Sequence, residues 1–314
     1  MTAALRLLFA GSPNAAVPSL RALAGSRHRI EAVITRDDSP VGRKHVLTPT
    51  PVARAAEGLG LRVIKADRLR ERTDELVALC VETPIDLGVV VAYGGLIREP
   101  LLSAPRCGWI NLHFSLLPRW RGAAPVQHAV ISGDAETGTA VFQLVEELDA
   151  GPLLDVERQP IGRLQTAGHL LDQLAASGAS QLERVVDALA RGTAIATPQT
   201  GEVTLAPKLE PGAGRIDWNC PAEEISQRIR GVTPEPGAFT EYAGERVKLH
   251  QVGIAHGATR LPPGVLSARG GDVLVGTATD PLILLRIQPA GKTAMAADDW
   301  WRGRRPDAPE SFVS

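Results

Sequence analysis

The chain has 314 residues and carries 34 Lys and Arg against 35 Asp and Glu, so its formal net charge is −1. Apolar residues make up 44% of the chain and charged residues 22%, a composition that excludes a disordered protein and a coiled coil. At roughly 150 residues per domain, this length predicts about two domains, each large enough to bury its own core.

The first half of the chain alternates short apolar runs with helix-like stretches, which is the pattern of a doubly wound α/β domain. The predicted strands are Leu5–Ala10, Ile30–Thr35, Leu61–Lys65, Leu87–Ala92, Trp109–His113 and Ala140–Val145. The predicted helices are Val17–Ala24, Pro51–Glu57, Glu71–Val81, Pro125–Ile131 and Ala167–Arg191. The continuous apolar run at Leu87–Ala92 is typical of a central parallel strand that is buried on both faces.

Beyond about Thr200 the composition and the spacing of apolar runs change. Pro and Gly recur there and separate short strand-like runs, a spacing that predicts a small β-barrel. These runs are Arg246–His250, Gly264–Ser267, Asp272–Gly276 and Leu282–Gln288. We place the domain boundary between Thr197 and Ala206, which gives a first domain over residues 1–200 and a second over residues 206–314.

Cysteine usage and apolar run length bear on the compartment. The cysteines Cys80, Cys107 and Cys220 are odd in number and widely spaced, so we expect no disulfide framework and no CxxC metal site. No apolar run approaches the ~20 residues of a membrane span. The run Leu5–Ala10 is too short for a signal peptide and lacks a basic segment before it. We therefore expect a cytoplasmic protein.

Polar residues follow or end several predicted strands, where ligands bind in open α/β sheets. Asn111 and His113 are two residues apart on one predicted strand, so their side chains point the same way. Asp149 follows a neighbouring predicted strand, where a carboxylate would orient the His113 ring and stabilise its protonated form. Without a Ser or Cys nucleophile, these groups suit direct acyl transfer to an amine, with the Asn111 amide holding the carbonyl oxygen. From spacing alone, a turn Asn, a core His and a surface Asp are the open alternative.

Two common nucleotide sites are absent from this sequence. A dinucleotide site needs three spaced glycines after the first strand, and only Gly11 stands there. The phosphate-binding pattern GxxxxGK[ST] does not occur either. A nicotinamide-dependent enzyme and most nucleotide hydrolases are thereby disfavoured.

The residues after Asn111 carry a longer pattern. The segment Asn111–Pro125, NLHFSLLPRWRGAAP, closely resembles the signature of the methionyl-tRNA formyltransferases, part of the wider family that uses 10-formyltetrahydrofolate as formyl donor. Further matches run in the same order along nearly the whole chain: Phe9–Pro13, Val89–Gly94, Gly133–Gly138, Leu148–Pro152, Lys208–Leu209 and Arg215–Trp218. A pattern of this length and order is hard to meet by chance.

The resemblance implies a fold and a set of site residues. The implied fold is a Rossmann-like formyltransferase domain with a mostly parallel sheet, followed by a small OB-like β-barrel domain. The implied catalytic residues are Asn111, His113 and Asp149, with no metal. The implied folate-binding residues are Tyr93, Gly94, Ser115, Leu116, Leu117 and Pro118. The implied tRNA-binding parts are the barrel and the loop Arg36–Thr48, with Arg43 and Lys44.

The resemblance also implies an activity. We expect an enzyme that transfers the formyl group of 10-formyltetrahydrofolate to the amino group of methionine on initiator Met-tRNA, for translation initiation. We expect a monomer with this tRNA and the folate as partners and with no membrane partner. The alternatives are a formyltransferase acting on an amino-sugar nucleotide and a catalytically idle RNA- or folate-binding protein. The presence of all three polar residues argues against an idle binder.

Two departures from the family pattern stand near these residues. Many relatives continue the tRNA loop with a further Gly and paired lysines, where this chain has Lys44-His45-Val46. Many relatives have Gly two positions before the catalytic Asp, where this chain has Glu147. The first departure weakens the implied binding of tRNA by this loop, and the second leaves the catalytic trio unchanged.

Overall fold

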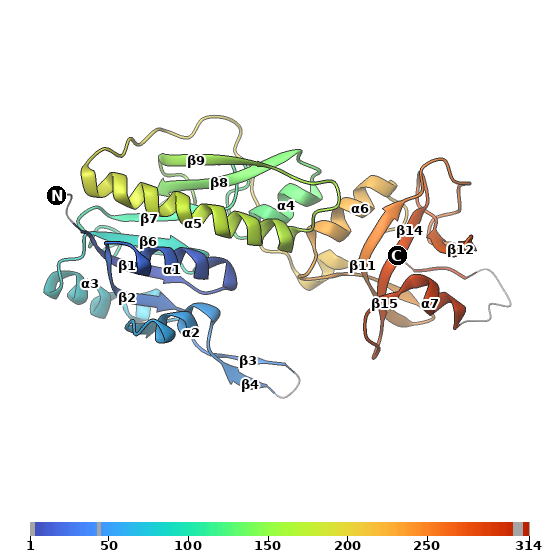
Figure 1. Ribbon diagram of the computed structural model, residues 1–314, viewed down its shortest axis with the longest axis horizontal. Helices are drawn as coiled ribbons and strands as arrows, with labels where there is room; N and C mark the ends of the chain where they lie inside the picture. Colours follow the sequence, from blue (N-terminus) through green and yellow to red (C-terminus); the bar gives the residue numbers. More distant parts are fainter. Residues whose placement is uncertain (1–3, 43–44, 304–309, 314) are drawn as a thin grey trace. The chain divides into compact units, whose positions relative to one another are not determined.

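The structure, a computed structural model, describes residues 4–42, 45–303 and 310–313 (Figure 1). The chain folds into two compact units. The first unit contains the chain up to Pro125 together with Thr137–Pro160 and Leu171–Ala206, and the second contains the rest. The predicted domains, residues 1–200 and 206–314, stay a prediction, and the compact units differ from them by two inner segments, Val126–Glu136 and Ile161–Leu170.

One sheet forms the framework of the first unit, with the strand order β5-β2-β1-β6-β7-β8-β9 among the described residues. Its strands are β1 (Arg6–Gly11), β2 (Arg29–Thr35), β5 (Val63–Lys65), β6 (Leu87–Val91), β7 (Trp109–His113), β8 (Glu136–Gln143) and β9 (Leu153–Pro160). All pairs from β5 to β7 are parallel, and β8 runs antiparallel to β7. The predicted mostly parallel α/β sheet is confirmed.

Helices cover this sheet. They are α1 (Val17–Gly25), α2 (Pro51–Gly58), α3 (Thr73–Glu82) and α5 (Ala167–Arg191), with short 3-10 turns η1 (Asn14–Ala16) and η2 (Leu69–Glu71). Helix α4 (Pro125–Ile131) belongs, apart from Pro125, to the second unit, where Ile131 packs against the core. The start of α2 follows its sequence, because the Thr50 hydroxyl accepts a hydrogen bond from the Ala53 N–H at 3.0 Å and Pro51 takes the first helical position.

The long helix α5 lies along β7 and β8 (Figure 1). It approaches them closely at Gly178, where a Cβ would stand only 3.0 Å from the Leu112 side chain and 3.3 Å from Thr139. Leu112 is the central residue between Asn111 and His113. Because side chains alternate along a strand, α5 covers the Leu112 face and leaves Asn111 and His113 on the opposite face.

The local predictions differ in how well they hold. The strand Trp109–His113 and the helices Pro125–Ile131 and Ala167–Arg191 are confirmed to the residue. The strand predicted at Ala140–Val145 is wrong at both ends, since β8 spans Glu136–Gln143. Strand β9 was not predicted, because it carries charged residues and is only partly buried along its length.

The second unit contains an antiparallel sheet. Among the described residues its strand order is β10-β11-β14-β13-β12, and β15 pairs with β14. The strands are β10 (Ala238–Tyr242), β11 (Glu245–Ile254), β12 (Leu266–Arg269), β13 (Asp272–Val275), β14 (Leu282–Pro289) and β15 (Met295–Ala296). The unit also contains the 3-10 turn η3 (Pro211–Gly214), α6 (Ala222–Gly231) and α7 (Ala297–Arg302).

The end of the described chain joins the two edges of this second sheet. Val313 pairs with Glu241 of β10, and Ser311 pairs with Val265 just before β12. Phe312, between them, stacks on Trp218 at 5.5 Å between ring centroids. The curled antiparallel sheet agrees with the predicted barrel-like domain. No helix among the described residues has the length and apolar character needed to cross a membrane.

Candidate active site

A cavity of about 750 Å³ opens at the carboxyl ends of β6 and β7. This edge of the sheet is where ligands bind in open α/β folds. Five of the predicted site residues line it together: Tyr93, Gly94, Asn111, His113 and Asp149. Its other walls include Leu96, Ile97, Phe114, Leu144, Val145 and Leu148. The volume and the mixture of apolar walls with a few polar groups are those of a small-molecule site.

Asn111 lies in the middle of β7 and its side chain faces the cavity. Its Oδ1 is buried and has no hydrogen-bond partner among the described residues. Buried polar atoms are nearly always paired, and an unpaired one costs about 1–3 kcal/mol. The Asn111 amide is therefore a group that a ligand would satisfy.

The ring of His113 is fixed by a neighbouring carbonyl. Its Nε2 lies 2.9 Å from the backbone oxygen of Trp120, and this oxygen only accepts hydrogen bonds. Nε2 therefore carries a proton and donates it to the carbonyl. The other ring nitrogen, Nδ1, lies 3.9 Å from Oδ2 of Asp149. His113 is thus left with Nδ1 as the nitrogen that can gain and lose a proton.

Asp149 reaches His113 by a route that differs from the prediction. Because β8 is antiparallel to β7, its last residue, Gln143, lies beside Ile110 at the far end of β7. The chain after Gln143 has to return toward the carboxyl end before Asp149 meets His113. At Asp149 the backbone is left-handed, with φ 48°, and Oδ2 accepts a hydrogen bond from the Gly122 N–H at 2.8 Å.

Gln199, for which the sequence gives no signal, secures this part of the site by a hydrogen bond to the backbone at Asp149. Glu147, which stands where many relatives have Gly, forms an exposed ion pair with Arg121. Arg121 is one of the arginines in the family signature, and its side chain braces these loops instead of facing the cavity. A polar residue some 50 positions away along the chain gives no local signal.

Tyr93 contributes a wall and backbone to the cavity but no acid or base. Its hydroxyl donates to the Ala66 carbonyl at 2.5 Å, and only 2% of the residue is exposed. Burial, with a smaller effect of Asp67, raises the pKa of the Tyr93 phenol to about 12. The phenol therefore stays neutral and engaged at physiological pH. Gly94 follows it, with φ 84°, at the cavity edge.

The remaining predicted folate residues, Ser115, Leu116, Leu117 and Pro118, are not among the residues that line the cavity. The Ser115 hydroxyl donates to the Arg119 carbonyl at 2.6 Å, and Leu117 packs with Ala140 and Phe142. In the structure this segment shapes the turn that delivers Trp120 and Gly122 to the site.

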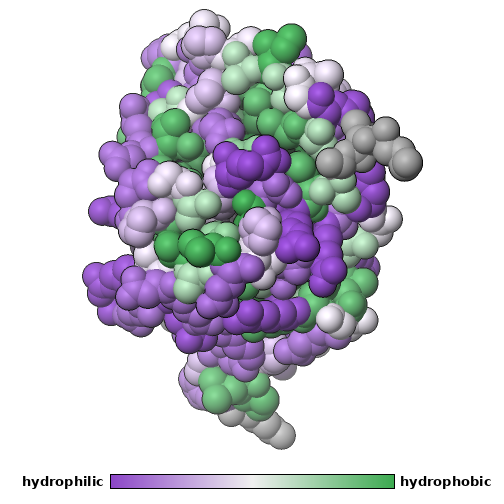
Figure 2. Space-filling view, turned by 90° about the vertical axis from the view of Figure 1, so that its left-hand side faces the viewer, coloured by the Kyte–Doolittle hydropathy of each residue, from purple (hydrophilic) through white to green (hydrophobic). Residues whose placement is uncertain are grey.

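The predicted tRNA loop contains a hairpin that the sequence analysis did not identify, formed by β3 (Ser39–Val41) and β4 (Val46–Thr48). Arg43 and Lys44 lie outside the described residues. The hairpin projects from the first unit and carries an apolar patch near its tip (Figures 1 and 2). There Val46 and Leu47 are 59% and 67% exposed.

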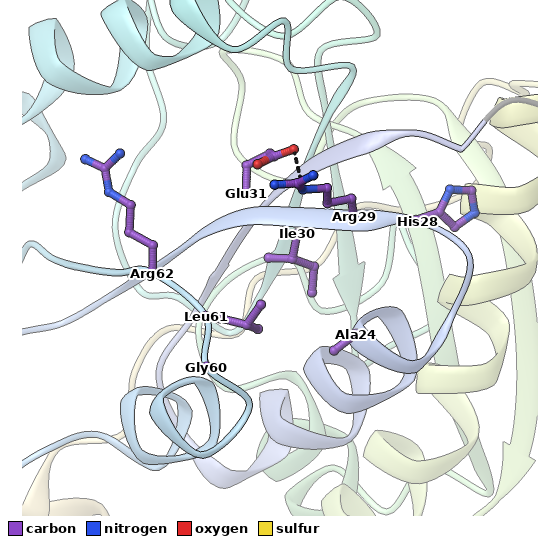
Figure 3. Close-up of a pocket in the computed structure, with 8 residues that line it drawn as sticks. All are labelled: Ala24, His28, Arg29, Ile30, Glu31, Gly60, Leu61 and Arg62. Atoms are coloured by element: carbon purple, nitrogen blue, oxygen red, sulfur yellow. Dashed lines mark ion pairs between the residues drawn. The ribbon is translucent and has the colours of Figure 1, made fainter.

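A second cavity, of about 360 Å³, lies near the start of β2, at the opposite edge of the sheet (Figure 3). Arg29 and Glu31 form an ion pair there at 3.0 Å, drawn as the dashed line in Figure 3. Arg62 pairs with Glu75, and both ring nitrogens of His28 have partners. No group in it is arranged to act on a ligand, among the residues that the structure describes.

Comparison with protein families gives two matches that cover most of the chain. Residues 5–186 match the family described as formyl transferase, and residues 208–305 match the formyl transferase C-terminal domain. The first match contains every residue of the proposed catalytic trio.

The chain is similar over nearly its whole length to curated bacterial proteins. The methionyl-tRNA formyltransferase of Leifsonia xyli subsp. xyli is 60% identical over 299 residues, which covers 95% of this chain and 97% of that protein. The methionyl-tRNA formyltransferase of Thermobifida fusca is 48% identical and covers 98% of this chain and 99% of its own length. Among solved structures, the sugar 3N-formyl transferase WlaRD, with dTDP and 5-N-formyl-THF, shares the fold. Its TM-score is 0.65 at 15% identity, over 93% of this chain and all of that one.

Proposed function

The chain belongs to the formyl transferase family, and we propose that it transfers the formyl group of 10-formyltetrahydrofolate to the amino group of methionine on initiator tRNA. The names of the similar curated proteins favour a methionyl-tRNA acceptor over an amino-sugar nucleotide. The observation that carries the chemistry is the convergence of Asn111, His113 and Asp149 in one cavity, where the buried Asn111 Oδ1 has no hydrogen-bond partner among the described residues.

Asn111 acts on the carbonyl oxygen of the formyl group. When an amine attacks a formyl carbon, negative charge develops on that oxygen. Nδ2 of the Asn111 side chain, which is held on a strand, stabilises this charge by donating a hydrogen bond. Its rigid position on β7 means that no reorganisation is needed as the charge forms.

His113 and Asp149 handle the proton. The attacking amine loses a proton as its nitrogen bonds to the formyl carbon, and the bond from that carbon to the folate nitrogen breaks. The Trp120 carbonyl keeps the proton on Nε2, so Nδ1 accepts the proton from the amine. The Asp149 carboxylate, 3.9 Å away, stabilises the charged ring. His113 then returns the proton to the departing nitrogen.

The same cavity suits the formyl donor. Formyltetrahydrofolate is an elongated molecule that carries an activated formyl group on nitrogen. The cavity volume of about 750 Å³ lies in the range of drug-sized ligands. We propose that the backbone at Tyr93 and Gly94 meets its ring and that the apolar residues Leu96, Ile97 and Val145 cover its length. In this proposal Ser115–Pro118 supports the pocket.

The remaining parts of the proposal concern the tRNA and the cell. We propose that the hairpin loop with Arg43 and Lys44 and the second unit contact the tRNA. We also propose that residues 1–200 and 206–314 act as the formyltransferase and tRNA-binding domains. An aminoacyl-tRNA substrate implies a cytoplasmic enzyme. The expected monomeric state stays a prediction.

The test is transfer of labelled formyl from 10-formyltetrahydrofolate. The protein is offered initiator Met-tRNA and, in a parallel reaction, an amino-sugar nucleotide, with an Asn111→Ala variant as the control for adventitious transfer. We expect label on the tRNA-bound methionine alone, and only with the parent protein. Label on the sugar, or none on the tRNA, would overturn the proposal.

A further inference from the structure

The chain segment that follows α5 forms hydrogen bonds near two loops of the active site. One loop carries Asp149 and the other carries Arg121. At one end Thr197 and Leu153 exchange two backbone hydrogen bonds of 2.8 and 2.7 Å. At the other end the Arg121 N–H donates to Thr204 O at 2.9 Å, and the Ala206 N–H donates to Arg121 O at 2.8 Å. Residues 197–206 therefore form a strap that joins the Asp149 loop to the Arg121 turn.

Gln199 is the residue of the strap whose side chain contacts the Asp149 loop. Its Nε2 donates to the Asp149 carbonyl at 2.7 Å and to the Gly151 carbonyl at 2.8 Å. Its Oε1 accepts from Nε and Nη2 of Arg121 at 3.2 and 2.8 Å. A guanidinium only donates, so Arg121 fixes the orientation of the amide and turns its donor group toward the two carbonyls.

The loop at this point needs support. Asp149 is in the left-handed region, which costs a non-glycine residue free energy unless its surroundings hold it. Two residues later the backbone is tightly packed, since a Cβ at Gly151 would lie only 1.7 Å from the Gln143 carbonyl oxygen. Gln199 binds the carbonyls on both sides of this bend and so sets the direction of the Asp149 side chain.

A second link to the same loop is weaker. Arg121 Nη1 also pairs with Glu147 at 2.9 Å, but the Glu147 side chain is 75% exposed. Ion pairs this exposed contribute little, because water and salt screen them. Arg121 itself is only 9% exposed, and its contact with Gln199 is partly buried. The amide of Gln199 is therefore the main link.

We propose that Gln199, held by Arg121, is a positioning residue that aims the Asp149 carboxylate at Nδ1 of His113 and at the Gly122 N–H. This inference rests on the proposed function, because turnover is its readout. The two fail differently: a wrong function gives no formyl transfer by the parent protein, whereas a wrong inference gives normal transfer by a Gln199 variant.

The test compares two substitutions at Gln199 with a matched control. Gln199→Met keeps the length of the side chain and removes every hydrogen bond. Gln199→Glu keeps the acceptor for Arg121 but turns a carboxylate oxygen toward two carbonyls. Gln159→Met makes the first change at a half-buried glutamine outside the site, whose Nε2 donates to Gln173 at 2.9 Å.

Both Gln199 variants should lose between about tenfold and a hundredfold in kcat, which is the range for a displaced catalytic group. The KM for the folate should stay within about twofold, since the cavity walls are unchanged, and Gln159→Met should match the parent. Thermal unfolding shows whether each variant is folded. If Gln199→Met does not fold, the kcat of Gln199→Glu tests the proposal. Parent-like kcat in a folded variant, or a loss confined to KM, would overturn the proposal.

A double-mutant cycle identifies the residue through which Gln199 acts. In an Asp149→Asn background, measured under single-turnover conditions, adding Gln199→Met should change the rate by less than about twofold, because the carboxylate that it aims is already gone. Rate losses that multiply would mean that Gln199 acts independently of Asp149, and the inference would be wrong.

Discussion

The two cavities of the first unit lie at opposite edges of one sheet and differ in whether their polar groups have charged partners. In the described part of the chain, a buried oxygen without a hydrogen bond occurs in both, but Oε1 of Glu31 forms an ion pair with Arg29. At the amino-terminal edge, Arg29 faces Glu31 (Figure 3). Arg62 pairs with Glu75 there, and His28 binds Asp187. At the carboxyl edge, the Asn111 amide oxygen is buried without a partner among the residues that the structure describes, and one ring nitrogen of His113 forms no hydrogen bond with them. Charged groups alone therefore do not mark a site in this fold. Unsatisfied groups that converge do so.

The largest effect should come from His113→Ala, because no other residue takes over the proton of the attacking amine. Removing a positioned acid–base group typically lowers the rate by about 10² to 10⁴. Single-turnover formyl transfer with enzyme in excess measures the chemical step without product release. A folded variant that retained parent-like turnover would remove His113 from the mechanism.

Asn111→Ala should follow, with a loss of about 10² to 10³ in rate for one donor to the developing negative charge. The control is Arg29→Ala, which removes the ion pair between Arg29 and Glu31 in the second cavity and should leave formyl transfer unchanged. If Arg29→Ala slowed the reaction as much as Asn111→Ala, the contrast between the two cavities would be false.

The residues of the carboxyl-edge cavity could be predicted where a local pattern determines them. The apolar run of β6 and the two-residue spacing of Asn111 and His113 fix which side chains share an edge and a face. Asp149 and the two-domain organisation also follow from the predicted strand ends and from the change in composition near Thr200, and the resemblance implies both again. These features depend on periodicity and on a contiguous signature, both of which survive in a single sequence.

What could not be predicted depends on contacts between distant segments. The return of the chain from Gln143 to Asp149 follows from the antiparallel pairing of β8 with β7. The sequence of β8 does not indicate the direction of this pairing. Gln199 stands in a stretch without regular structure and acquires its role only by folding beside Arg121 and Asp149. The hairpin β3–β4 is short and exposed, so it has no hydrophobic alternation to reveal it.

Tyr93→Phe tests whether a hydroxyl that is already hydrogen bonded contributes to the reaction, although its residue lines the active-site cavity. Tyr93 lines the cavity, yet its hydroxyl is satisfied by the Ala66 carbonyl. The variant should keep nearly all activity and lose about 1 kcal/mol of stability, the net value of one hydrogen bond. Activity and urea unfolding measured side by side test this. A large loss of turnover at unchanged stability would show that the phenol takes part in the reaction.

The smallest effect should come from Asp187, which binds His28 behind the second cavity. Burial raises the pKa of the Asp187 carboxyl, but hydrogen bonds from His28 and Arg27 outweigh it, so the pKa lies below its ordinary value. A carboxyl of this kind stabilises the fold above its unfolded pKa, and the stabilisation is lost as the pH falls through the folded value. Asp187→Asn should therefore unfold more easily than the parent at neutral pH, with formyl transfer unchanged. The difference should begin to shrink near the ordinary value of 3.8 and vanish below the folded one. Urea unfolding at stepped pH measures it, and a difference that persisted in acid would reflect packing of the Asn side chain, since the charge would no longer be present.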